Sequence, residues 1–329
     1  MRPRVADCVL IVSFAATCVE VGFGAPTDFK LLPLVPPGAQ IVSGFENRPD
    51  RNTASLLLTT HNNVLDLDDW RSLSGVDPKA SFSEVIEVTI APSGKLLNEH
   101  MLLAAGKFHH DRIFRSEGLD GARSIQYLGQ TVLLIEPFPR EKTEMKDTRW
   151  LTILDDRIVI FGTVWMVQQA VSRFENRALP DPVLMGRLAL FHRDVSSWNV
   201  LTSVPNLRQS VFLQSGGPLS TLFKDAELML VGIHVNSKVR VDLLMHLNKE
   251  GGTVDPNQKA AQFSRVFAQE TVQDDDRMPQ LKNVQVEENR VQASVVLSND
   301  DFILWKSGQM RRDRSVIDRA EGKAKKEAP

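Results

Sequence analysis

The sequence predicts an α+β protein made of two similar units, each an antiparallel sheet with helices packed on one face. Three observations support this class. The order strand, helix, two strands, helix, strands, helix occurs twice along the chain. Hairpin-length connections join most of the predicted strands, which indicates antiparallel pairing. At 329 residues the chain also exceeds the roughly 250 residues at which single cores stop growing, so two units are expected.

The first unit is expected over residues 25–178 and carries most of the predicted strands. Apolar runs and turn residues place its strands at 39–45, 84–91, 101–107, 124–128, 131–136, 149–154 and 157–161. Its helices are expected at 53–73, 109–117 and 164–174. In the last of these, Val164, Val167, Val171 and Phe174 recur at three- and four-residue spacing, which predicts one buried helix face.

The second unit is expected over residues 183–310, after a linker at 178–182 that contains two prolines. Strands are predicted at 187–192, 198–202, 227–235, 239–246, 282–287 and 290–297, with helices at 206–214, from 255 and from 298. In the long hairpin, apolar residues match across the strands only if Val235 lies opposite Val239 through a three-residue loop. The alternation also predicts that His234 and His246 face solvent.

The first 24 residues have the layout of a secretory signal peptide. Arg2 and Arg4 precede an apolar run from Val9 to Val19, which at 11 residues is shorter than the ~20 that span a bilayer. Small residues then place the cleavage between Gly24 and Ala25. We therefore expect an exported protein, periplasmic or extracellular. A competing interpretation keeps the apolar run in the mature fold.

Cys8 and Cys18 are the two cysteines of the chain, and both lie in this leader. The mature chain would then contain no disulfide, thiolate metal site or cysteine nucleophile. A second alternative makes Cys18 a lipid-modified residue that anchors the protein, although Thr17 before it fits such a site poorly.

Charge argues against a polyanionic partner. The formal net charge is −2 and the isoelectric point is about 6.4, so no global basic surface is available for nucleic acid. Residues 311–329 hold seven basic and four acidic residues and are expected to be a disordered, solvated tail.

Several short motifs resemble a family of uncharacterised exported bacterial proteins, a domain of unknown function that follows a signal peptide. They are Leu32–Ala39, Gly75–Pro78 with Phe82 and Val85, Gly106–Phe108, Tyr127–Gly129 and Ile160–Thr163. The resemblance covers about residues 31–175 and implies no activity and no catalytic residue. Ser81 stands where the family pattern would have an acidic residue.

One cluster of candidate metal ligands occurs, at His109, His110 and Asp111. Adjacent residues on a helix point about 100° apart, so both histidines cannot face one ion, and we expect no metal site and no cofactor here. The remaining motifs have explanations in folding. We therefore expect a binding or structural module of the cell envelope without catalysis, whose partner is an envelope protein or a small ligand. The alternative is an envelope hydrolase that uses carboxylate or histidine residues.

Overall fold

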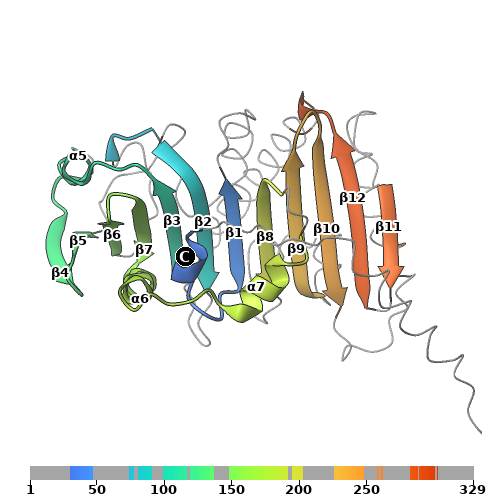
Figure 1. The fold of residues 1–329 in the computed structure, drawn as a ribbon, viewed down its shortest axis with the longest axis horizontal. Coiled ribbons are helices and arrows are strands. Elements are labelled where there is room, and N and C mark those ends of the chain that lie inside the picture. The colour runs from blue at the N-terminus through green and yellow to red at the C-terminus, as the bar shows by residue number, and fades with distance from the viewer. Residues whose placement is uncertain are drawn as a thin grey trace, which may run out of the picture.

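The fold is a single antiparallel sheet of twelve strands (Figure 1). The structure, a computed structural model, describes residues 30–46, 74–77, 81–90, 99–116, 119–136, 148–191, 195–202, 226–247, 258, 261, 282–287, 289–300 and 302. The predicted fold class is therefore wrong in its main feature, because one continuous, mainly β sheet replaces two separate sheet-and-helix units.

The strands follow the order β11-β12-β10-β9-β8-β1-β2-β3-β7-β6-β5-β4, and each pairs antiparallel with its neighbours. The first half of the chain supplies β1 (Ile41–Glu46), β2 (Phe82–Ile90), β3 (Glu99–Gly106), β4 (Arg123–Tyr127), β5 (Gln130–Ile135), β6 (Arg149–Leu154) and β7 (Ile158–Thr163). The second half supplies β8 (Ser197–Thr202), β9 (Ala226–Val235), β10 (Val239–Leu247), β11 (Lys282–Glu287) and β12 (Arg290–Leu297).

The two halves of the chain meet where β1 pairs with β8 in the middle of the sheet. On one side the strands run outward as β1, β2, β3, β7, β6, and on the other as β8, β9, β10, β12, β11. On the first side, the third strand β3 is followed by β7, which is the second arm of the β6–β7 hairpin. On the other side, the third strand β10 is followed by β12, which is the second arm of the β11–β12 hairpin. Because β1 and β8 bond directly to each other, the halves share one sheet. The superposition of residues 31–178 on 183–310 stays a prediction.

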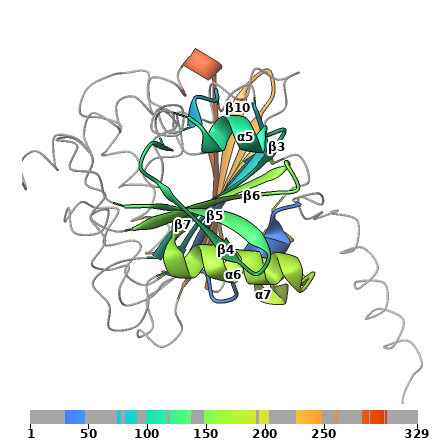
Figure 2. The same cartoon turned by 90° about the vertical axis from the view of Figure 1, so that its left-hand side faces the viewer.

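Helices lie on both faces of the sheet (Figure 2). The face that we call the α6 face carries α6 (Val164–Glu175), α7 (Pro182–Leu188) and the short helix η1 (Leu32–Leu34), whose buried residues belong to one apolar cluster. The opposite face carries α5 (His110–Phe114), whose Ile113 is buried in a second cluster. The expectation that helices gather on one face is thus also wrong.

Most predicted strands are confirmed to within about two residues at each end. The register of the long hairpin is also confirmed, with Val235 opposite Val239. A predicted strand at 187–192 is wrong, because α7 occupies most of that segment. The side chain of Asp181 caps this helix by accepting a hydrogen bond from the Val183 amide at 3.0 Å, and Pro182 takes the first helical position.

The predicted signal peptide, the helices at 53–73 and 206–214 and the tail at 311–329 lie outside the described residues. Within the part of the chain that is described, no helix combines the length and the apolar character needed to cross a membrane.

Trp198 packs at the seam between the two halves. Its neighbours across the sheet are Gly44 on β1 and Gly232 on β9, and its side chain is fully buried. A Cβ added at Gly44 would overlap the Cζ2 and Cε2 atoms of the indole, so only glycine leaves room for this ring. A Cβ at Gly232 would lie 3.0 Å from the ring of Phe191, which packs on the same face. The glycines therefore let large aromatic rings lie directly on the sheet.

We predict that Gly44→Ala destabilises the protein by about 1–3 kcal/mol, because the added methyl group displaces a buried indole from a close-packed core. Equilibrium unfolding in urea, followed by circular dichroism, measures this change in the free energy of unfolding. The matched control is Gly186→Ala in α7. A Cβ at Gly186 meets nothing within 4 Å, so this change should leave the stability unchanged or raise it by about 0.5–1 kcal/mol. Equal effects of the two substitutions would contradict the packing account.

Candidate functional site

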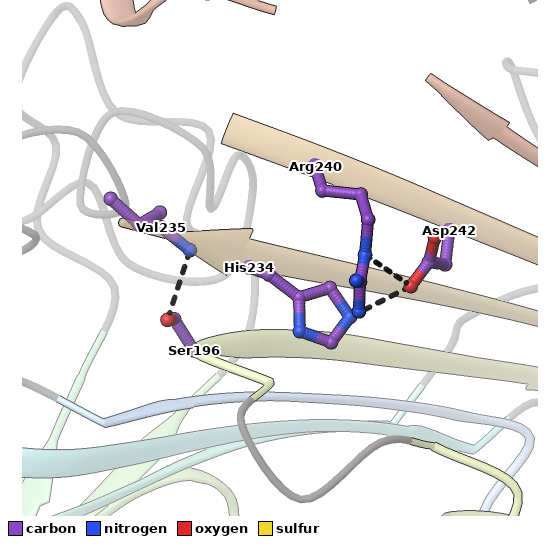
Figure 3. A network of polar contacts seen from close by, with 5 residues as sticks. All are labelled: Ser196, His234, Val235, Arg240 and Asp242. Atoms are coloured by element: carbon purple, nitrogen blue, oxygen red, sulfur yellow. Dashed lines mark hydrogen bonds and ion pairs between the residues drawn. The ribbon is translucent and has the colours of Figure 1, made fainter. Parts of the chain in front are cut away.

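A polar cluster lies on the hairpin of β9 and β10, on the α6 face (Figure 3). Its centre is His234, which is only 2% exposed although the sequence pattern predicts a solvent-facing side chain. The prediction is wrong because strand alternation assigns a residue to one face of a sheet without saying whether that face is covered. Leu228 and Leu230, which share the face of His234, are buried as well.

Two basic side chains converge on one carboxylate oxygen of Asp242. The Nε2 atom of His234 lies 2.9 Å from Oδ2 of Asp242, and Nε of Arg240 donates a hydrogen bond to the same oxygen at 3.0 Å. His234 and Arg240 are register partners across the hairpin, and Asp242 follows two residues later on the same face. The pairing of β9 with β10 thus positions all three groups, and the carboxylate is oriented before any ligand arrives.

Ser196, the residue just before β8, lies next to this hairpin (Figure 3). Its hydroxyl accepts a hydrogen bond from the backbone amide of Val235 at 3.2 Å. The fold therefore brings serine, histidine and aspartate, the residue types of a hydrolytic triad, into one neighbourhood. Ser196 is 4% exposed, so both the hydroxyl and the imidazole lie beneath the surface. A triad needs its nucleophile open to substrate, and this arrangement does not provide that.

An open groove lies beside the cluster, over β10, β12 and β11. Its volume is about 330 Å³, and it is lined by Arg240, Asp242, Gln285, Gln292, Ala293, Ser294 and Val296. A smaller cavity of about 30 Å³ lies inward of it, against Phe191 and Leu230. Asp242 and Gln292 line both spaces. The groove thus combines an ion pair, amide side chains and a hydroxyl, which can donate and accept hydrogen bonds.

A second buried polar group is Glu84 on β2, which is 6% exposed. Its Oε2 accepts a hydrogen bond from the Lys30 amide at 3.1 Å, and its Oε1 accepts one from the Leu31 amide at 3.3 Å. Burial raises the pKa of Glu84 to about 7, although the two backbone donors act against the rise. This carboxyl therefore titrates near neutral pH.

His100 on β3 also has a polar neighbour. Its Nδ1 lies 3.1 Å from the Oγ1 of Thr89, its register partner on β2. Burial lowers the pKa of His100, and the nearby Arg149 lowers it further. The same cause lowers the pKa of His246, with Arg290 adding to the effect.

The predicted weak cluster lies at the start of α5. His109 precedes the helix, and Nδ1 of His110 lies 3.7 Å from Oδ1 of Asp111, whose side chain is 87% exposed. The ring of His110 stacks on Phe114 with 3.9 Å between centroids. Across the residues that the structure describes, no group of three or more His, Cys, Asp or Glu side chains could hold an ion. Cys8, Cys18, Gly24 and Ala25 lie outside those residues.

Sequence reasoning missed the groups that matter most in the structure, namely His234, Arg240, Asp242 and Glu84. One signal was present for the first three, because a charged pair alternates with apolar residues in β10 opposite a histidine in β9. For Glu84 the signal was weaker, since a single glutamate in an apolar strand also suits an exposed position.

We predict that Asp242→Ala lowers the free energy of unfolding by about 1–3 kcal/mol, because the buried His234 and the neighbouring Arg240 lose the carboxylate that both contact. Chemical denaturation measures the loss. The control is Gln285→Ala, an exposed groove residue on β11, which should change stability by less than about 0.5 kcal/mol. If Asp242→Ala is as stable as this control, the cluster has no structural role.

Comparison with known proteins bears on the fold alone. No family model matches the chain, and no characterised protein matches it by sequence. The chain is similar in structure to TP0453, solved in its crystal form I, with a TM-score of 0.50 and 13% sequence identity. The match covers 86% of this chain and 98% of that chain. A large sheet of this kind is therefore shared with a solved protein.

Proposed function

We propose that the protein is exported to the cell envelope and acts there by binding a small polar ligand in the groove over β10, β12 and β11. The observation that carries the proposal is the carboxylate of Asp242, which Arg240 and His234 orient at the wall of this groove. A fixed acceptor next to a guanidinium needs little reordering when a ligand binds, which favours affinity.

The composition of the groove indicates the type of ligand. Arg240 and Asp242 carry opposite charges and balance each other, while Gln285, Gln292 and Ser294 both donate and accept hydrogen bonds. Such a surface suits a molecule of low net charge that is rich in hydroxyl or amide groups. A volume of about 330 Å³ is at the lower end of the range typical of small-ligand sites.

Export is proposed on the basis of the leader sequence, and the resemblance to exported bacterial proteins agrees with it. Binding is preferred to hydrolysis because the serine and histidine of the polar cluster, Ser196 and His234, are buried, at 4% and 2% exposed. In a working hydrolase both would have to reach the scissile bond.

The test is a titration followed by NMR, with the disaccharide of N-acetylglucosamine as the probe. This sugar carries both hydroxyl and amide groups and little charge, as the groove requires. We expect saturable shifts of the backbone amides of β10 and β12, and we expect Arg240→Ala combined with Gln292→Ala to abolish them. The control variant is Gln130→Ala, which changes a half-buried glutamine of β5, near the opposite end of the sheet, and should bind normally.

Shifts confined to other strands, or no shifts at millimolar probe, would count against a ligand of this type in the groove. Cleavage of the disaccharide that is lost in His234→Ala would replace binding with the hydrolase alternative.

A further inference from the structure

We propose that Glu84 makes the docking of residues 30–35, here called the N-terminal strap, dependent on pH, so that the strap is held more firmly below neutral pH than above it. This device is independent of the groove, since it lies on β2 in the first half of the chain.

The strap is a short segment whose buried side chains are apolar. Leu31, Leu32, Leu34 and Val35 are buried in the cluster of the α6 face. Arg173 of α6 fixes its backbone by donating from Nε to the carbonyl oxygen of Pro33 at 2.7 Å. Within the strap, Leu34 and Val35 donate to the carbonyls of Leu31 and Leu32. These contacts hold the strap against α6 on the α6 face of the sheet.

Glu84 provides a titratable contact at the beginning of this segment. Each of its two carboxyl oxygens accepts one backbone amide of the strap, from Lys30 and from Leu31. Because Leu31 is fully buried over this position, docking covers the carboxyl. The side chain thus loses water when the strap docks, and the loss penalises its charged form.

The charges around Glu84 come from two elements. Glu46 on β1 is its register partner, so a second carboxylate lies directly across the strand pair and disfavours ionisation. The positive charge of Lys30 in the strap lowers the pKa of Glu84, but this effect is smaller than that of Glu46. On the other side, β3 places the uncharged Ala105 opposite Glu84. Burial and the charge of Glu46 raise the pKa of Glu84 by more than the hydrogen bonds and the charge of the strap lower it. The pKa of Glu84 therefore rises from 4.5 to about 7.

The direction of the pH effect follows from linkage. With the strap docked, Glu84 keeps its proton up to about pH 7, whereas an exposed glutamate loses it near pH 4.5. Docking therefore takes up a proton between these values, and its equilibrium constant falls as the pH rises through this window. If the undocked pKa is about 4.5, the constant falls about tenfold between pH 6 and pH 8.

The experiment is hydrogen exchange of the strap amides, expressed as protection factors so that the intrinsic pH dependence of exchange is removed. We expect the protection of Leu31, Leu34 and Val35 to fall about tenfold from pH 6 to pH 8. Local exchange is preferred to a global melting curve because the lowered pKa values of His100 and His246 act in the opposite sense, reducing stability as the pH falls.

Three variants decide the outcome. Glu84→Gln cannot titrate, so its strap protection should be flat with pH. Glu136→Gln changes an exposed carboxylate and should keep the profile of the wild type. If Glu84→Gln does not fold, Glu46→Gln replaces it and should move the midpoint to lower pH, because it removes the like charge. A flat wild-type profile, a tenfold fall that persists in Glu84→Gln, or an unmoved midpoint in Glu46→Gln would overturn the proposal.

Discussion

The packing of Trp198 against Gly44 is the contact on which the rest of the fold depends. It lies where β1 meets β8, the single strand pair that joins the two halves of the chain within the described sheet. A large ring lies directly on the backbone of the opposite strand only where that strand lacks a Cβ. The indole is fully buried and belongs to one apolar cluster with residues from both halves of the chain. Twelve strands thus form one body, although the chain is long enough for two.

Trp198 and Gly44 belong to a row of register partners that crosses the sheet, and this row also explains where the candidate site lies. On the α6 face it runs through Ile86, Gly44, Trp198, Gly232, Asp242 and Ser294, from β2 to β12. The row changes from apolar to polar at Gly232, where Phe191 covers the glycine and the carboxylate of Asp242 follows. His234 lies at this boundary and is buried, while Arg240 and Asp242 reach the groove. The carboxylate therefore lies between a buried core on one side and an open groove on the other, and Arg240 and His234 orient it there.

Local sequence signals predicted most strands and the register of the long hairpin, because alternation and turn length are properties of a few neighbouring residues. The strand predicted at 187–192 failed because the capping signal of Asp181 and Pro182 was interpreted as part of a linker. The joining of the halves could not be predicted, since the pairing of Ser43 with Asn199 depends on residues far apart in the sequence. For the same reason Glu84 was missed, because its hydrogen-bond partners, the amides of Lys30 and Leu31, lie more than fifty residues away in the sequence. His234 and Asp242 lie on one hairpin, and what its local pattern did not show is that His234 is buried.

Native-state hydrogen exchange in increasing denaturant tests the central claim, that the seam makes the two halves one sheet. The slowest amides of β2 and β3 report on the first half, and those of β9 and β10 report on the second. If the sheet is one cooperative body, both sets converge on the same free energy of opening and the same dependence on denaturant. Two separate limits, with one half opening while the other stays protected, would contradict the claim.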